Sequence, residues 1–165
     1  MRYLRGHAAE LWIAALVVAF DQATKALVKA KLSLHESINI IPGFFDITHV
    51  RNTGAAFGML NSVDFEYKPV IMVVVAIIAL AAVAAYAVTL PADQRIARYG
   101  LALILGGAVG NLIDRATMGF VVDFVDVYWR GVHFWAFNVA DSAITVGVIL
   151  MLLDVVGVGR VPETV

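Results

Sequence analysis

Polar and ionisable residues interrupt this apolar sequence in a few short stretches, and their types indicate where chemistry is possible. The stretch "FNVADSAI" places Asn138 and Asp141 three residues apart, directly before an uncharged aliphatic run. The stretch "VVDFVDVYW" carries two further acids, Asp123 and Asp126. An ionisable side chain beside lipid is costly when it has no partner, so each of these acids requires either a partner or a function.

Three more stretches carry residues that a site could use. In "DQATK", Asp21 and Lys25 lie four residues apart on one helix face, where they form either a structural ion pair that closes a span or part of a site. In "NTGAAFG", Asn52 precedes small residues that begin at Gly54, and small residues let a substrate or another backbone approach closely. In "GNLIDR", three polar residues lie within five positions, and structural bonding between helices explains them as well as a site does. They are Asn111 and Asp114, which share a helix face, and Arg115, which can pair with a carboxylate.

The residue inventory favours carboxylate chemistry. The chain has no cysteine, no serine in the context of a nucleophile elbow and no HExxH zinc motif. Two aspartates held close together share one proton near neutral pH, so one can activate a water while the other protonates the substrate. The best pair is Asp123 with Asp141. Strand alternation directs Asp126 to the opposite face from Asp123, so Asp126 is expected to be idle.

The composition is that of a membrane protein. Of the 165 residues, 61% are hydrophobic and 15% are charged, whereas soluble domains have roughly 45–50% and about 25%. The mean hydropathy is +0.85. A net charge of −1 provides no bulk attraction to nucleic acid, and the lack of cysteine excludes disulfides and thiolate metal sites.

Four transmembrane helices are predicted within a single domain that covers residues 1–165. A span needs about 20 mostly apolar residues, and charged side chains near the ends of a shorter apolar run can reach the interface. Arg2 and Arg5 before the first apolar run also fit a signal peptide, but no convincing small-residue cleavage site follows, so an uncleaved span is the better interpretation. The predicted helices cover about 9–31, 69–90, 96–115 and 139–159.

Two long connections, 32–68 and 116–138, fall on one side of the membrane if the chain has four spans. Both contain runs of β-branched and aromatic residues, "FFDITHVRN" and "VVDFVDVYW", which favour strands. A small sheet beside the helix ends is therefore predicted. The chemistry-bearing residues all belong to these connections or to the adjoining helix ends, which indicates one common site. Basic residues are divided almost evenly between the two sides, so the charges do not settle the orientation.

Taken together, these stretches resemble the bacterial lipoprotein signal peptidase family, signal peptidase II, whose members are integral-membrane aspartic endopeptidases. The matching segments are "DQATK", "NTGAAFG", "GNLIDR", "VVDF" and "FNVADSAI", in the family's order. By this resemblance the catalytic residues are Asp123 and Asp141. The supporting polar residues are Asp21, Asn52, Asn111, Asp114, Arg115 and Asn138. One departure is Trp135, where the family often has proline, and a local change in loop packing is expected there.

The resemblance implies removal of a prolipoprotein signal peptide just before a diacylglyceryl-modified cysteine, and no cofactor or metal is expected. It implies an all-α integral membrane fold of four transmembrane helices with a small extracytoplasmic β-cradle. The expected location is the bacterial cytoplasmic (inner) membrane, with both termini cytoplasmic and the active site toward the extracytoplasmic face. The expected partners are diacylglyceryl-modified prolipoproteins and membrane lipids, and the chain is expected to be a monomer. The 59–68 segment is a candidate lid.

Two other classes of protein could use the same residues. A small proton-coupled transporter would use buried acids as relay sites, but it would distribute them through the depth of the membrane. Here Asp154 is the one acid deep toward the other face. A non-catalytic membrane scaffold would use the polar groups for folding alone, and replacement of Asp123 or Asp141 would then reduce folding more than activity.

Overall fold

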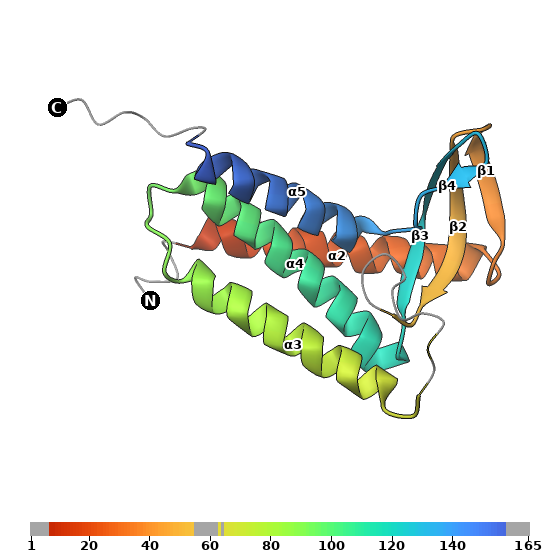
Figure 1. Cartoon of the computed structure of the whole chain (residues 1–165), viewed down its shortest axis with the longest axis horizontal. Helices are drawn as coiled ribbons and strands as arrows, with labels where there is room; N and C mark the ends of the chain where they lie inside the picture. The colour runs from red at the N-terminus through yellow and green to blue at the C-terminus, as the bar shows by residue number, and fades with distance from the viewer. Residues whose placement is uncertain (1–6, 55–62, 64, 158–165) are drawn as a thin grey trace.

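The computed structural model describes residues 7–54, 63 and 65–157. Figure 1 shows long helices running side by side, with a small sheet standing across one end of them. The start of α2 and the end of α5 lie together at the opposite end. In chain order the elements are α2 (Ala8–Lys31), β1 (Ser37–Ile41), β2 (Phe45–Asn52), α3 (Lys68–Ala87), α4 (Arg95–Met118), β3 (Val121–Trp129), β4 (Val132–His133) and α5 (Val139–Val155).

Three of the helices, α2, α3 and α4, are long and apolar enough to cross a membrane. The fourth, α5, has 17 residues, slightly fewer than the roughly 20 that a span normally requires. The most apolar window of α3 buries none of its residues inside the protein. Its exposed aliphatic surface therefore suits contact with lipid, as the predicted membrane location requires.

The four predicted helices are confirmed as helices, with three differences at their C-terminal ends. The predicted 69–90 helix ends at Ala87, because the chain turns just before Pro91, and proline disfavours helix at the residue before it. The predicted 96–115 helix continues to Met118, where Gly119 ends it with a φ of 78°, a left-handed conformation that glycine adopts without strain. The predicted 139–159 helix ends at Val155.

Helix α4 is central and packs against the other three helices. Glycines on two of its faces bring neighbouring backbones very close. A Cβ atom on Gly106 would lie 2.8 Å from the carbonyl oxygen of Ala14 in α2, and one on Gly107 would overlap the carbonyl oxygen of Ala140 in α5. The GxxxG spacing of Gly106 and Gly110 therefore marks the face of α4 that packs on α2.

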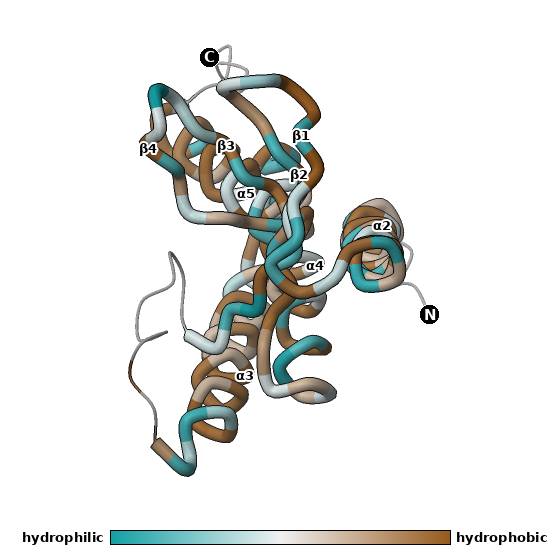
Figure 2. The backbone as a smooth tube through the Cα atoms, turned by 90° about the vertical axis from the view of Figure 1, so that its right-hand side faces the viewer, coloured by the Kyte–Doolittle hydropathy of each residue, from teal (hydrophilic) through white to brown (hydrophobic). Residues whose placement is uncertain are grey.

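The four strands form one antiparallel sheet in the order β1-β2-β3-β4. The strands predicted from "FFDITHVRN" and "VVDFVDVYW" are β2 and β3. In their register, Val50 pairs with Asp123 and Asp46 pairs with Asp126, with an irregularity between Ile47 and Val50. A small core seats the sheet on the end of α2, and its buried members are Val28, Leu32, Val122 and Phe124. In Figure 2, viewed from the sheet end, apolar residues dominate the helices while hydrophilic ones recur along the strands.

The contact between α4 and α5 provides a first prediction. Replacing Gly107 with valine should lower the thermal unfolding temperature clearly, because the added side chain meets the Ala140 carbonyl and Ile144. Overpacking of this kind costs about 1–3 kcal/mol. Replacing Ala82 with valine is the control, because Ala82 is exposed on α3. Equal unfolding temperatures for the two variants would show that the α4–α5 contact is looser than described.

Candidate active site

Two aspartates from different elements, Asp123 buried and Asp141 partly buried, meet at the sheet end of the helices. Asp123 lies on β3 and is 3% exposed, and Asp141 lies in the first turn of α5. The side chain of Asn138 connects them. Its Nδ2 donates to Asp123 Oδ1 at 2.7 Å, and its Oδ1 accepts from the backbone N–H of Asp141 at 3.0 Å.

Asn138 holds this position because it is the N-cap of α5. The first N–H groups of a helix have no partner within the helix, and an asparagine side chain can satisfy one of them. Here the bond is reciprocal, since Asp141 Oδ2 accepts from the Asn138 backbone N–H at 3.2 Å and completes a capping box. The cap therefore sets the orientation of the Asp141 carboxylate while the same side chain holds Asp123.

Each carboxylate also accepts a hydrogen bond from the amide side chain of another asparagine. Asn111 Nδ2, from α4, donates to Asp141 Oδ1 at 2.8 Å. Asn52 Nδ2, from the end of β2, donates to Asp123 Oδ2 at 3.1 Å. Neutral amide donors orient a carboxylate without adding positive charge beside it, so a shared proton is still favoured.

A buried ion cluster lies directly behind these amides. Lys25 Nζ contacts Asp21 Oδ2 at 2.8 Å and Asp114 Oδ2 at 3.0 Å, and it donates to Asn111 Oδ1 at 2.9 Å. The three charged side chains are at most 1% exposed. An ammonium group has three N–H donors, and all three have acceptors here. The Asp21–Lys25 pair is therefore both a structural ion pair and a part of the candidate site.

The two acids of this cluster also bind the backbone next to the two aspartates. Asp21 Oδ1 accepts from the N–H of Ala140, the residue before Asp141, at 3.0 Å. Asp114 Oδ2 accepts from the N–H of Val122, the residue before Asp123, at 3.1 Å. One ion cluster thus sets the position of both chain segments that carry the site.

Arg115 contacts backbone rather than a carboxylate. Among the described residues its hydrogen bonds go to the carbonyl oxygens of Gly54, at 3.0 Å, and Asn111, at 3.4 Å. The ion pair that the sequence allowed for Arg115 is not among the close contacts of the described residues, because the guanidinium reaches across to the end of β2 instead. Gly54 N–H in turn donates to Asn52 Oδ1 at 3.0 Å, so Arg115 and Gly54 together hold the amide that faces Asp123.

Asp126 lies outside this network, as the strand alternation predicted. Its carboxylate contacts His133 Nδ1 at 2.9 Å, and the His133 ring stacks on Tyr128. Trp135 is well exposed. Half of the candidate 59–68 lid, residues 59–62 and 64, lies outside the described residues.

Two residues of the site were not identified from the sequence. Gln22 Nε2 donates to Asp114 Oδ1 at 3.0 Å and to the Gly110 carbonyl at 3.1 Å. Its position next to Asp21 in "DQATK" was the available signal. Lys68 is buried and donates to Thr53 Oγ1 at 3.0 Å and to the carbonyl of residue 63 at 2.7 Å. A lysine at the first residue of an apolar helix was the signal, because a cation there opposes the helix dipole.

The electrostatics favour a proton on the aspartates near neutral pH. Burial, followed by the negative charge of Asp141, raises the pKa of Asp123 from 3.8 to about 7, although hydrogen bonds from Asn52 and Asn138 act in the opposite direction. No group of three or more His, Asp or Glu in the described part of the chain could hold a metal ion. Because the pKa of Asp123 lies near neutral pH, the arrangement can exchange protons with a bound water and an adjacent carbonyl.

Comparison with known proteins places this chain in one family. The family profile described as "Signal peptidase (SPase) II" matches residues 13–157. A lipoprotein signal peptidase of Geobacter metallireducens is 50% identical over 144 residues, covering 87% of this chain and 88% of that protein. One of Syntrophotalea carbinolica is 49% identical over 143 residues, again covering 87% and 88%. A solved bacterial membrane enzyme, determined in meso at 2.3 Å resolution, superposes with a TM-score of 0.78 at 34% identity, covering 96% of this chain and 95% of that one.

The ion cluster predicts a large effect of replacing Lys25 with methionine. This change leaves Asp21 and Asp114 buried without their cation, and breaking a buried ion pair typically costs about 3–5 kcal/mol. Thermal unfolding in detergent should show a strong loss of stability. Lys29→Met is the matched control one turn further on, because Lys29 is exposed. If both variants unfold at the same temperature, the cluster does not support the site.

The raised pKa of Asp123 predicts that stability falls as pH rises. Below about pH 4 both the folded and the unfolded chain hold the proton. Between that pH and about pH 7 the unfolded chain releases the proton while the fold keeps it, so the free energy of unfolding decreases. Asp123→Asn should remove most of this slope, whereas Asp126→Asn should keep it. Unfolding temperatures measured from about pH 4 to about pH 8 test this, and parallel curves for wild type and Asp123→Asn would contradict it.

Proposed function

The chain belongs to the signal peptidase II family, and from this premise we propose that it is an aspartic endopeptidase that removes the signal peptide of prolipoproteins, cutting before a diacylglyceryl-modified cysteine. The observation that supports this proposal most directly is the pair of carboxylates, on Asp123 and Asp141, that both accept hydrogen bonds from Asn138. Each carboxylate is oriented by amide donors, so both can exchange protons without moving. This arrangement supports hydrolysis by acid and base in concert.

In the proposed mechanism Asp141 carries the charge at rest and Asp123 carries the proton. Asp141 lies at the N-terminus of α5, where the helix dipole favours a negative charge. The pKa of Asp123 is raised to about 7, so its neutral form is well populated. Two aspartates in different surroundings can therefore take the two different roles.

The proton transfers then balance over one cycle. The water oxygen attacks the scissile carbonyl carbon while Asp141 accepts a proton from that water. At the same time Asp123 donates its proton to the carbonyl oxygen. The C–N bond of the resulting diol breaks as Asp141 passes the water's proton to the leaving nitrogen. Asp123 regains a proton from a diol hydroxyl, which forms the new carboxyl group and restores the resting pair.

The proposed setting is the bacterial cytoplasmic (inner) membrane, with α5 as a fourth span, both termini cytoplasmic and the site toward the extracytoplasmic face. The site lies where the helices meet the sheet, opposite the start of α2 and the end of α5 (Figure 1). A diacylglyceryl-modified substrate could keep its acyl chains among membrane lipids there while its peptide enters a polar site. Both aspartates come from one chain, which supports a monomer as the active form.

Cleavage of a purified diacylglyceryl-modified prolipoprotein tests the proposal. Asp123→Asn and Asp141→Asn should each lower the cleavage rate by at least about 100-fold, because each removes a proton-transferring group. Thermal unfolding measured on the same preparations should show that both variants remain folded.

Asp126→Asn is the matched control, since it changes a neighbouring acid on β3 that contacts His133 instead. It should cleave at the wild-type rate. Folded wild type that leaves the lipidated substrate intact would contradict the peptidase, and proton flux would then test the transporter alternative. Unfolding of both aspartate variants together with wild-type rates in their folded fraction would favour the scaffold.

A further inference from the structure

The two faces of the sheet differ in polarity. One face carries a continuous polar network across all four strands. Asn39 of β1 donates to Asp46 of β2 at 2.6 Å, Tyr128 of β3 donates to Asp46 at 3.1 Å, and the Tyr128 ring stacks on His133 of β4. His133 also contacts Asp126. Beyond Val122 and Phe124, which lie on the same face and pack on the end of α2, this face is suited to water.

The opposite face is apolar and begins at the site. Side chains alternate along a strand, so Val125, Val127 and Trp129 lie on the same face as Asp123. Trp129 pairs with Val132 across the β3–β4 turn, and Phe134 N–H donates to the Val127 carbonyl, which places Phe134 on this face as well. The face therefore continues from the site to the end of the hairpin.

The outer part of the apolar face is uncovered. We name the hairpin patch as the apolar residues that are more than half exposed at this end of the sheet. Trp129 at 65%, Val132 at 74% and Phe134 at 54% lie on the apolar face, and Trp135 at 61% follows them in the connection to α5. Contiguous apolar surface of this kind is rare in water and marks contact with a membrane or a partner.

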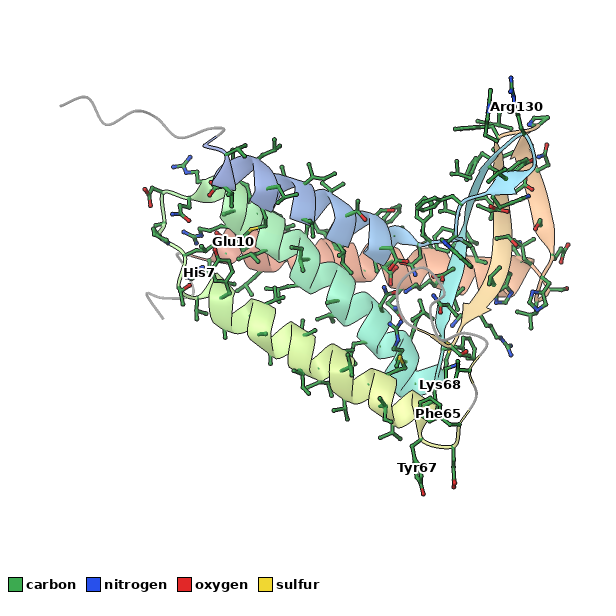
Figure 3. All side chains as sticks on the ribbon, in the orientation of Figure 1. His7, Glu10, Phe65, Tyr67, Lys68 and Arg130 are labelled. Atoms are coloured by element: carbon green, nitrogen blue, oxygen red, sulfur yellow. The ribbon has the colours of Figure 1, made fainter. Side chains whose placement is uncertain are left out.

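The position of the hairpin patch indicates which of these it contacts. Asp123 meets the start of α5, so its face of the sheet is turned toward that helix, whereas Val122 and Phe124 of the other face pack on the end of α2. In Figure 1 the end of the sheet that carries β4 reaches beyond α5, and in Figure 3 Arg130 lies at its tip and points away from the helices. Helix α5 also exposes apolar side chains, at Val146, Val148, Ile149 and Leu152.

We propose that the hairpin patch rests in the interface of the same bilayer, at the boundary between lipid headgroups and acyl chains, and that it sets the depth of Asp123 relative to the lipid. Tryptophan is favoured at this boundary because its ring is apolar while its N–H is polar. The guanidinium of Arg130 at the tip suits headgroup phosphates. The polar face then remains in water, as for an amphipathic element lying on a membrane. The proposal does not depend on peptidase activity.

Tryptophan fluorescence can locate the patch directly, because the chain has three tryptophans. In the variant Trp12→Phe with Trp135→Phe, the emission comes from Trp129 alone. In vesicles, lipids brominated high on the acyl chain should quench it more strongly than lipids brominated near the chain end. The complementary variant, Trp12→Phe with Trp129→Phe, should give the same order for Trp135.

Three outcomes would overturn the proposal. Quenching by aqueous acrylamide without quenching by brominated lipid would place the patch in water. Protection from both quenchers would place it against a second copy or another protein. Lipid quenching that disappears when an uncleavable lipidated prolipoprotein is added would identify the patch as a surface for substrate.

Val132→Glu and Val132→Leu supply a matched pair at one position of the patch. The charged variant should reduce lipid quenching of Trp129 by about twofold, because a carboxylate is disfavoured at the apolar boundary, while leucine should leave it unchanged. If the depth of the site matters for the proposed cleavage, Val132→Glu should be slower than Val132→Leu in vesicles and equal to it in detergent. Equal lipid quenching in the two variants would contradict the membrane contact even if cleavage is absent.

Discussion

A single buried ammonium group is the interaction on which the rest of this structure depends. Lys25 of α2 contacts Asp21 within its own helix and Asp114 and Asn111 of α4. An ammonium group in an apolar interior is tolerated only if its charge is matched and its donors are bonded. The helices therefore cannot shift past each other without exposing an uncompensated charge. The same acids also accept hydrogen bonds from the N–H of Ala140 and of Val122, so the constraint extends to both segments that carry the site.

The cluster supports the aspartate pair without adding a cation directly to it. Asn111 separates the two, because its oxygen accepts from Lys25 while its nitrogen donates to Asp141. The charge of Lys25 is balanced mainly by its own acids, and among the influences on Asp123 its effect is smaller than those of burial and of Asp141. A cation placed against the pair would lower its pKa values and remove the shared proton. Amide donors orient the carboxylates and leave the proton in place.

Local periodicity explains most of what could be predicted from the sequence. The uncharged run in 69–90 predicts a span because of its length and composition, and the β-branched runs predict β2 and β3. Spacings of three or four residues place Asn111 with Asp114 on one helix face, and they bring Asn138 and Asp141 together at a helix start. Alternation along β3 separates Asp123 from Asp126. Each of these features depends on residues that are close together in the chain, so residue types and their spacing were enough to predict it.

Contacts between distant segments were decided only by the tertiary structure. The sequence by itself determined the long apolar helices, the strands and the candidate acids of the site. The sequence left Arg115 free to pair with a carboxylate. In the packed chain Arg115 instead donates to the Gly54 carbonyl. The signal for Gln22 was only its position next to Asp21, and its contact with Asp114 arises because α2 lies against α4. That approach is close because Gly106 has no side chain, and side-chain partners across a helix interface depend on such distances of a few tenths of an ångström. Periodicity within one element cannot specify them, since they depend on how two elements pack.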